Sequence, residues 1–340
     1  MPNVLPRAQR LDSRILPLDN GNCALSWSDS ARCERLTTFL AVIRLVSHKT
    51  GIWSMRYLTF VAAAVFVVTT ACALAADGRK SPGATELTNP LAVRLMNYGQ
   101  FQDVAWTHLP SVGVHYLFLA VPAPRDVASV KRKLAASGLT ALVLRGDANL
   151  AKESSVDELA AQLATCEKLG VKYMFLSPKH PGAGKEVVYE RLRRAGEVAR
   201  KHGVTIVLET HPDLGANGDM HRETMRQIHH PNVRVNFDTG NITFYNTGLD
   251  AATELKKCID YVATVEVKDH DGKLKSWNFP VLGTGVVDFP AVLRVLEEHR
   301  FRGPITMEVE GFQGVVLDEA QTKKYIGDSA AYIKSLGKFR

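Results

Sequence analysis

Four acidic side chains close short apolar stretches in the second half of this 340-residue chain. They are Glu209 in IVLETHPD, Asp238 in VNFDTGN, Glu266 in ATVEVKDHDG and Glu308 in ITMEVEG. In an extended strand every second side chain points to the same face, so Glu209 shares a face with Val207 and His211. If the faces that carry the four acids point inward from neighbouring strands, four carboxylates converge on one small volume.

Four carboxylates in one small volume cannot all stay ionised without compensating positive charge. A divalent cation would supply that charge, and a ring of oxygen ligands is what a hard cation prefers. The alternative is a network of salt bridges to basic side chains nearby in the fold, which would be Lys268, Arg145, Arg234 and His211. We favour the cation, because an acid ends four strands in succession.

The elements that must position these acids are short apolar strands that alternate with longer amphipathic segments. This alternation is typical of βαβ units and a parallel sheet. The predicted strands are 94–98, 115–121, 139–145, 172–177, 205–211, 234–238, 261–268 and 305–310. Helices are predicted over 127–137, 155–169, 186–202 and 289–299, each followed closely by a glycine.

Eight strand–helix units in about 260 residues predict a single-domain α/β protein, a closed (β/α)8 TIM barrel. An open doubly wound sheet is the main alternative. That fold would place a glycine-rich phosphate loop after the first strand, and Asn97-Tyr98-Gly99-Gln100-Phe101 is not such a loop. In a TIM barrel the active site lies at the carboxyl ends of the strands. We therefore expect further polar residues there to bind substrate, namely Asn97, Arg145, Lys179, Asn241 and Trp277.

Four segments of the chain resemble the xylose isomerase-like TIM-barrel superfamily, the sugar phosphate isomerase/epimerase group. They are LETHPDLGANG, VNFDTGN, the VEVKD strand and GTGVVDFPAVLRVLEEHRFRGPITMEVEG, and the resemblance spans residues 93–312. It implies one divalent cation held by Glu, Asp, His and Glu from strands five to eight. The first, second and fourth ligands correspond to Glu209, Asp238 and Glu308.

The third ligand departs from the family pattern. The usual strand reads His-x-His-x-Lys-Asp, and this one reads Thr-Val-Glu-Val-Lys-Asp over residues 264–269. Glu266 therefore stands where the liganding histidine is expected. As a ligand, a carboxylate shifts the preference toward Mg²⁺ or Mn²⁺ and away from Zn²⁺. The substitution also leaves open a site with weaker metal affinity or with no metal.

The resemblance implies an enzyme in which the metal holds a carbonyl and an adjacent hydroxyl. Paired glutamates then move a proton on and off the neighbouring carbon through an enediolate. We expect Glu209 and Glu308 to be the acid and base, and Lys268 to interact with the enediolate oxygen. His211 would bind a hydroxyl or carry a proton. The predicted activity is isomerisation or epimerisation of a sugar or keto-sugar.

Two other activities would use the same site. Proton abstraction beside a carbonyl can expel a leaving group from the next carbon, which would make the protein a lyase on 3-keto-glycosides or a dehydratase. The missing histidine also leaves room for a non-catalytic carbohydrate-binding barrel. An endonuclease acting on abasic DNA would need more histidine ligands and a basic face, so we set it aside.

The N-terminal quarter of the chain reads as a targeting segment. Residues 55–76, MRYLTFVAAAVFVVTTACALAA, predict a signal peptide that ends at the small-residue site Ala-Leu-Ala. The apolar core is shorter than the ~20 residues of a spanning helix, which favours cleavage over a membrane anchor. Lipid attachment at Cys72 is a less favoured alternative. Residues 1–54 would be a misassigned extension, 77–92 a linker and 93–340 the barrel.

This organisation predicts export to the periplasm or the cell exterior, with no stable membrane partner after cleavage. Phosphorylated sugars are scarce there, so we expect an unphosphorylated small carbohydrate as the substrate. Of the net charge of +7, residues 1–76 carry +4, and residues 77–340 have 34 Lys or Arg against 31 Asp or Glu. That balance, without a basic run, argues against a nucleic-acid partner. A homo-oligomer is compatible with the sequence.

Overall fold

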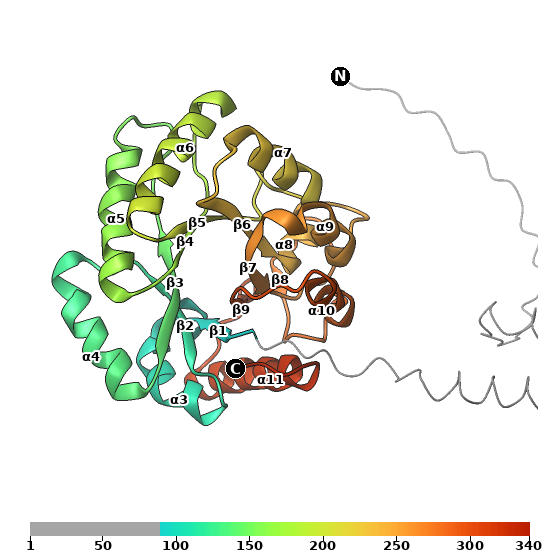
Figure 1. Cartoon of the computed structure of the whole chain (residues 1–340). Coiled ribbons are helices and arrows are strands. Elements are labelled where there is room, and N and C mark those ends of the chain that lie inside the picture. The colour runs from blue at the N-terminus through green and yellow to red at the C-terminus, as the bar shows by residue number, and fades with distance from the viewer. Residues whose placement is uncertain (1–88) are drawn as a thin grey trace, which may run out of the picture. The chain divides into compact units, whose positions relative to one another are not determined.

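The computed structural model describes residues 89–340, and these contain a closed barrel of eight parallel strands. The barrel strands follow one another in chain order, and the last one pairs with the first (Figure 1). They are β1 (Leu91–Arg94), β2 (Tyr116–Ala120), β3 (Thr140–Gly146), β4 (Tyr173–Leu176), β5 (Thr205–Glu209), β6 (Val233–Asp238), β7 (Val262–Val267) and β9 (Ile305–Met307). The predicted (β/α)8 barrel is therefore confirmed.

Helices surround the barrel and cover the outward faces of the strands (Figure 1). They are α3 (Ala105–Ser111), α4 (Val127–Ser137), α5 (Ser155–Leu169), α6 (Lys185–Lys201), α7 (Gly218–Ile228), α8 (Thr239–Tyr245), α9 (Ala251–Cys258), α10 (Phe289–Glu298) and α11 (Glu319–Ser335). The predicted bounds of α4 and α5 are met at both ends. Each of these two helices stops at a glycine in the left-handed conformation, Gly138 (φ 68°) and Gly170 (φ 72°), as glycine C-caps do.

The predicted position of the first strand is wrong. β1 covers Leu91–Arg94, so the predicted strand 94–98 shares only Arg94 with it, and residues 95–98 fall in a 3-10 helix, Leu95–Val104. The barrel therefore begins two residues before the predicted boundary at 93. The apolar run Leu-Ala-Val of β1 is short, and Asn89 joins the bottom of the barrel by donating its side-chain amide to the carbonyls of Phe301 and Gly303. Asn97 and Tyr98 consequently do not end a strand, and Arg94 does.

The interior of the barrel changes from apolar to polar along the strands. Phe118, Val143, Phe175 and Val207 form a buried apolar cluster of their own, separate from the core between strands and helices. Two residues after Val207 on the same face comes Glu209, at the carboxyl end of β5. The apolar cluster thus forms the floor beneath the polar carboxyl ends of the strands, where the active sites of TIM barrels lie.

The loop that follows β7 is held against this end of the barrel by one buried carboxylate, that of Asp269. Its Oδ1 accepts the backbone N–H groups of His270 (2.9 Å) and Val287 (3.2 Å), and its Oδ2 accepts those of Gly283 (2.9 Å) and Gly285 (2.8 Å). The same loop contributes β8 (Asn278–Phe279), which pairs antiparallel with β10 (Gly311–Phe312) from the segment after β9. Asp269 therefore fixes the path of the chain that carries Trp277.

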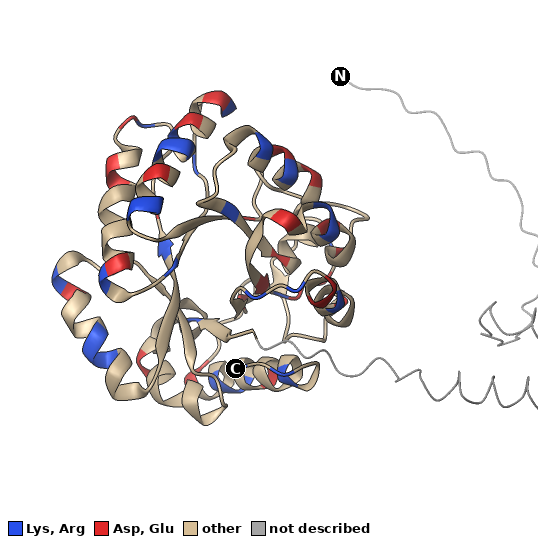
Figure 2. Ribbon diagram, viewed as in Figure 1, with Lys and Arg blue, Asp and Glu red and all other residues tan. Residues whose placement is uncertain are grey.

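Three further predictions concern the N-terminal segments, membrane association and the charge of the surface. The predicted extension, signal peptide, Cys72 and most of the linker lie outside the described residues. Within residues 89–340, no helix is both long enough and apolar enough to span a membrane. Figure 2 shows Lys and Arg interspersed with Asp and Glu along the outer helices in this view. Cys166 and Cys258 are buried free thiols.

We predict that Asp269→Asn lowers the free energy of unfolding by about 2 kcal/mol, because either orientation of the amide sets an NH₂ group against two backbone N–H donors. Urea denaturation measures this change. The matched control is Asp288→Asn, because Asp288 caps α10 through a single bond to the Ala291 N–H and asparagine caps helices equally well. Equal stability of the two variants would show that the Asp269 carboxylate does not hold the loop.

Candidate functional site

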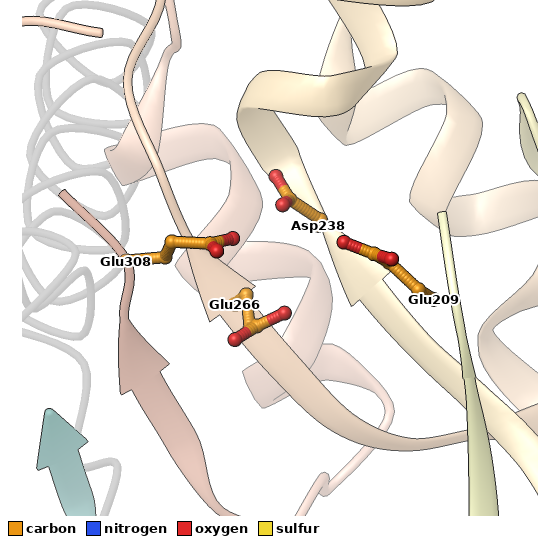
Figure 3. Close-up of side chains that lie close together, drawn as sticks. All are labelled: Glu209, Asp238, Glu266 and Glu308. Atoms are coloured by element: carbon orange, nitrogen blue, oxygen red, sulfur yellow. The ribbon is translucent and has the colours of Figure 1, made fainter. Parts of the chain in front are cut away.

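The four predicted acids meet at the carboxyl ends of neighbouring strands. Glu209, Asp238, Glu266 and Glu308 each offer a carboxylate oxygen, and these atoms all lie within 4.8 Å of one another (Figure 3). The strand register explains the meeting, since Asp238 pairs with Glu266 across β6 and β7, and Glu266 pairs with Thr306 across β7 and β9. The prediction that alternation would bring these four carboxylates together is confirmed.

Asp238 has one satisfied and one unsatisfied carboxylate oxygen. It is the N-cap of α8, and its Oδ1 accepts the backbone N–H groups of Gly240 (2.9 Å) and Asn241 (3.0 Å). Its Oδ2 is buried and has no hydrogen-bond donor among the described residues. Burial raises the pKa of Asp238 well above its ordinary value; Lys268 opposes this rise, and the carboxylates of Glu308 and Glu266 add to it. A buried, donor-free oxygen beside other carboxylates suits a cation.

Arg94 is a basic group of the site that the sequence analysis missed. Its Nε and Nη2 bond to the two carboxylate oxygens of Glu266, and its Nη1 forms an ion pair with Glu308. The guanidinium carbon lies 4.7 Å from the ring centre of Phe118 and 4.6 Å from that of Phe175. These rings stack on the cation in a position where water is excluded. Arg94 went unnoticed because the predicted first strand began at this residue, when in fact β1 ends there.

Glu266 is saturated by these contacts. Asn236 Nδ2 donates to its Oε2 over 2.7 Å, in addition to the two bonds from Arg94. Burial raises the pKa of Glu266, and the guanidinium of Arg94 opposes that rise. The predicted partners of the acid cluster in a salt-bridge network included Lys268 and Arg145, and of these Lys268 does pair with acids. The arginine that pairs with them is Arg94.

Lys268 is the second buried cation of the site. Its Nζ lies 3.5 Å from Glu308 Oε2 and 3.9 Å from Asp238 Oδ2, and it also pairs with Glu310. Burial lowers the pKa of Lys268, but these acids outweigh it and raise the pKa above its ordinary value. For Glu308, burial raises the pKa, and Arg94 and Lys268 together bring it below the ordinary value. Glu308 is therefore ionised at neutral pH.

The charges of the cluster do not balance. Within residues 89–340, two basic side chains, Arg94 and Lys268, form ion pairs with the cluster of Glu209, Asp238, Glu266 and Glu308. The cluster thus carries two more acids than bases, before Glu310 is included. Carboxylates that lack a counter-charge in a buried site must either bind protons or bind a cation. A divalent cation would remove the imbalance, and the oxygen donors fit a hard cation such as Mg²⁺ or Mn²⁺.

The cluster opens into a cavity of about 340 Å³, which is large enough for a small ligand. Glu209, Glu308 and Arg94 line it at the barrel end, and so do the predicted substrate-binding residues Asn97, Arg145 and Trp277. Asn97 reaches the cavity from the 3-10 helix after β1, where its Nδ2 donates to the Met307 carbonyl over 3.0 Å. Trp277 is partly exposed at the rim (45 %), as a ring that stacks on a ligand would be.

Three of the predicted residues lie elsewhere around the site. Lys179 lines a neighbouring cavity of about 570 Å³, and its Nζ pairs with Asp147 Oδ1 at 2.9 Å. Asn241 is buried and accepts a hydrogen bond from Lys268 Nζ at 3.3 Å, so it contacts the lysine and not the cavity. His211 packs edge-on against Tyr245, with 5.3 Å between ring centres, and is not among the residues that line the cavity.

Comparisons with known proteins agree with this architecture. The chain is 28% identical to the inosose dehydratases of Salmonella agona (strain SL483) and Salmonella typhimurium (strain LT2) over 141 residues. These matches cover 37% of this chain and 46% of each relative, so the chain spans about half the length of the curated relatives it matches.

Several solved structures share the fold, and two of them serve as examples. A xylose isomerase domain protein from Planctomyces limnophilus superposes with a TM-score of 0.61 at 23% identity, over 73% of this chain and 97% of that one. D-psicose 3-epimerase from Clostridium cellulolyticum H10 gives a TM-score of 0.61 at 15% identity, over 73% and 99% of the two chains. At these identities the likeness shows the fold alone.

The model of one protein family matches residues 104–336, which is well over half of the chain. The matched region includes seven of the eight barrel strands and all four acids of the cluster. With its closed eight-stranded barrel and its acids at the carboxyl ends of the strands, the chain belongs to the xylose isomerase-like TIM-barrel family.

Proposed function

We propose that this protein is a divalent-metal-dependent enzyme that isomerises or epimerises a small sugar or keto-sugar by moving a proton beside a carbonyl group. The observation that carries the proposal is the imbalance of the acid cluster, which includes the donor-free Asp238 Oδ2 and opens through Glu209 and Glu308 into a ligand-sized cavity. The sugar epimerase among the structural neighbours supports the same class of substrate.

The carboxylates of the cluster would hold the cation, and Glu266, whose two oxygens accept hydrogen bonds from Arg94 and Asn236, is the least available of them. When bound, a divalent cation polarises the carbonyl of the substrate and stabilises negative charge on its oxygen. Glu308 is ionised, lines the cavity and is therefore placed to accept a proton from a bound sugar. The side chain of Glu209 forms no hydrogen bond within residues 89–340 and lines the same cavity, so Glu209 would return the proton to the substrate.

Lys268 and the rim residues would bind and orient the substrate. Lys268 keeps a full positive charge beside Glu308, and its contacts hold that carboxylate in place. Trp277 would stack on the sugar ring, while Asn97 and Arg145 would donate hydrogen bonds to its hydroxyls. His211, whose ring packs against that of Tyr245, would carry a proton to or from the site.

A dehydratase or lyase is the second candidate, and the partial match to inosose dehydratases favours it. The same proton abstraction would then be followed by loss of a leaving group, and the leaving group would come from a 3-keto-glycoside or a related keto-sugar. Export by the segment 55–76 belongs to the proposal too, together with an unphosphorylated substrate and the absence of nucleic-acid and membrane partners. A homo-oligomer stays a prediction.

We predict that Glu308→Gln and Glu209→Gln each reduce turnover by about 100-fold or more, because each removes one group of the proton-transfer pair. The measurement is deuterium incorporation from D₂O into a panel of ketohexoses and keto-glycosides, followed by NMR with Mn²⁺ present. Glu197→Gln, an exposed carboxylate on α6, is the control and should keep full activity. Elimination in place of exchange would favour the dehydratase. Full activity of both site variants would exclude the mechanism.

We also predict that chelation of divalent ions lowers the melting temperature and that Mn²⁺ restores it. A cation that binds only the folded chain stabilises it by about 2.7 kcal/mol at one hundred times its dissociation constant. For a domain of this size that corresponds to roughly 5–10 °C. Differential scanning fluorimetry measures the melting temperature of the EDTA-treated protein after addition of Mn²⁺, with Na⁺ as the control. Equal melting temperatures with the two ions would contradict a metal in this site.

A further inference from the structure

The pairing of Arg94 with Glu266 divides the four acids into two kinds. Glu266 receives Arg94 Nε on one oxygen, and Arg94 Nη2 and Asn236 Nδ2 on the other, so both of its oxygens are occupied by donors. Asp238 Oδ2 has no such donor within residues 89–340, and no side-chain hydrogen bond to Glu209 is found there. Glu308 is intermediate, because Arg94 Nη1 contacts its Oε1 and Lys268 Nζ lies 3.5 Å from its Oε2. A cation competes poorly for a carboxylate that is already bound at both oxygens to a buried guanidinium.

We propose that Glu266 is the counter-ion that positions Arg94 and is not a metal ligand, so that Glu209, Asp238 and Glu308 alone hold the cation. The inference rests on the proposed function, since it assumes that the cluster binds a divalent ion. In this interpretation Glu266 neutralises Arg94, and Arg94 is a positioning residue that orients Glu308.

The charges support this division. Arg94 and Glu266 form a neutral pair, which leaves Glu209, Asp238 and Glu308 facing Lys268, an excess of two negative charges before Glu310, which also pairs with Lys268, is included. One divalent cation balances that excess. A neutral histidine at position 266 together with a neutral residue at position 94 would leave the same excess, so the arginine–glutamate pair leaves the net charge of the site unchanged. A glutamate at position 266 requires the arginine at position 94, because either charge without the other is not neutralised within the pair.

The position of Arg94 shows what the pair does for the metal ligands. Its guanidinium is buried between Phe118 and Phe175, and its Nη1 contacts Glu308. Glu266 neutralises the charge of Arg94, and the two aromatic rings hold the plane of the guanidinium in place. Arg94 in turn fixes one oxygen of Glu308, so this ligand has a defined orientation before a cation arrives.

Titration with Mn²⁺ alone, with free ion followed by electron paramagnetic resonance, separates the two roles. Four full-length proteins are compared: the parent, Glu266→Gln, the double variant Arg94→Met with Glu266→Gln, and Asp238→Asn. The double variant removes both charges, keeps a hydrogen-bonding partner for Asn236 and places an unbranched apolar side chain between the two rings. Asp238→Asn is the matched control, because asparagine keeps the N-cap of α8 and loses the anionic ligand.

We expect the double variant to bind one Mn²⁺ no more than about tenfold more weakly than the parent, because it loses the Arg94 contact that orients Glu308 but keeps all three ligands. Glu266→Gln should bind about tenfold more weakly, since the unpaired Arg94 then repels the cation and competes for Glu308. Asp238→Asn should lose about 100-fold or more. A double variant as weak as Asp238→Asn would overturn the inference and leave the metal site intact. A parent that binds no Mn²⁺ would overturn both the inference and the proposed function.

A second measurement uses the parent protein and does not depend on the stability of the double variant. In protein labelled with ¹⁵N-arginine, the Nε–H signal of Arg94 is identified by its loss in Arg94→Lys. We expect this signal to keep its chemical shift when Mg²⁺ saturates the site, because the bond to Glu266 persists. A large shift on addition of Mg²⁺ would show that Glu266 leaves the arginine for the cation and would overturn the inference.

Discussion

Electrostatic repulsion among carboxylates is the constraint on which the organisation of this barrel end depends. Closure of the parallel sheet forces the ends of β5, β6, β7 and β9 together, and each brings an acid. In a buried site this repulsion is screened little by water, so each acid needs a specific partner. Arg94 on β1 and Lys268 after β7 provide part of the positive charge. A bound divalent cation would balance the remaining deficit.

The way in which the positive charge is distributed decides what each acid can do. Glu266 is enclosed by Arg94 and Asn236, and Asp238 keeps one oxygen without a donor. Glu308 lies between Arg94 and Lys268 and stays ionised, with its side chain at the cavity. Acids that look equivalent in a strand pattern are therefore placed in different electrostatic environments, which is how one site can contain both ligands and a base.

Much of the fold and of the acid cluster could be predicted from the sequence, because both follow from periodicity. Parallel strands present their carboxyl ends at one edge, and alternation fixes the face of each side chain, so Glu209, Asp238, Glu266 and Glu308 had to converge. Glycines at 138 and 170 ended two helices at the predicted residue because a left-handed C-cap excludes most other residues.

The parts that could not be predicted are those that depend on which side chains meet across the barrel. Arg94 and Glu266 are 172 residues apart, and no local pattern joins them. The rings of Phe118 and Phe175 look like ordinary core residues in their strands, yet they enclose a cation. Lys179 follows β4 as predicted but reaches Asp147, because a long flexible side chain can choose among several neighbours. Periodicity gives the face of a residue and leaves its partner undetermined.

The most direct test of the account is the anomalous difference density from a crystal of the protein soaked in Mn²⁺. A single peak should lie within about 2.5 Å of carboxylate oxygens from Glu209, Asp238 and Glu308, with Glu266 still bound to Arg94. A peak ligated by Glu266, with Arg94 displaced, would contradict the division of roles among the acids. The absence of any peak at the cluster in crystals that diffract well would contradict the metal site itself.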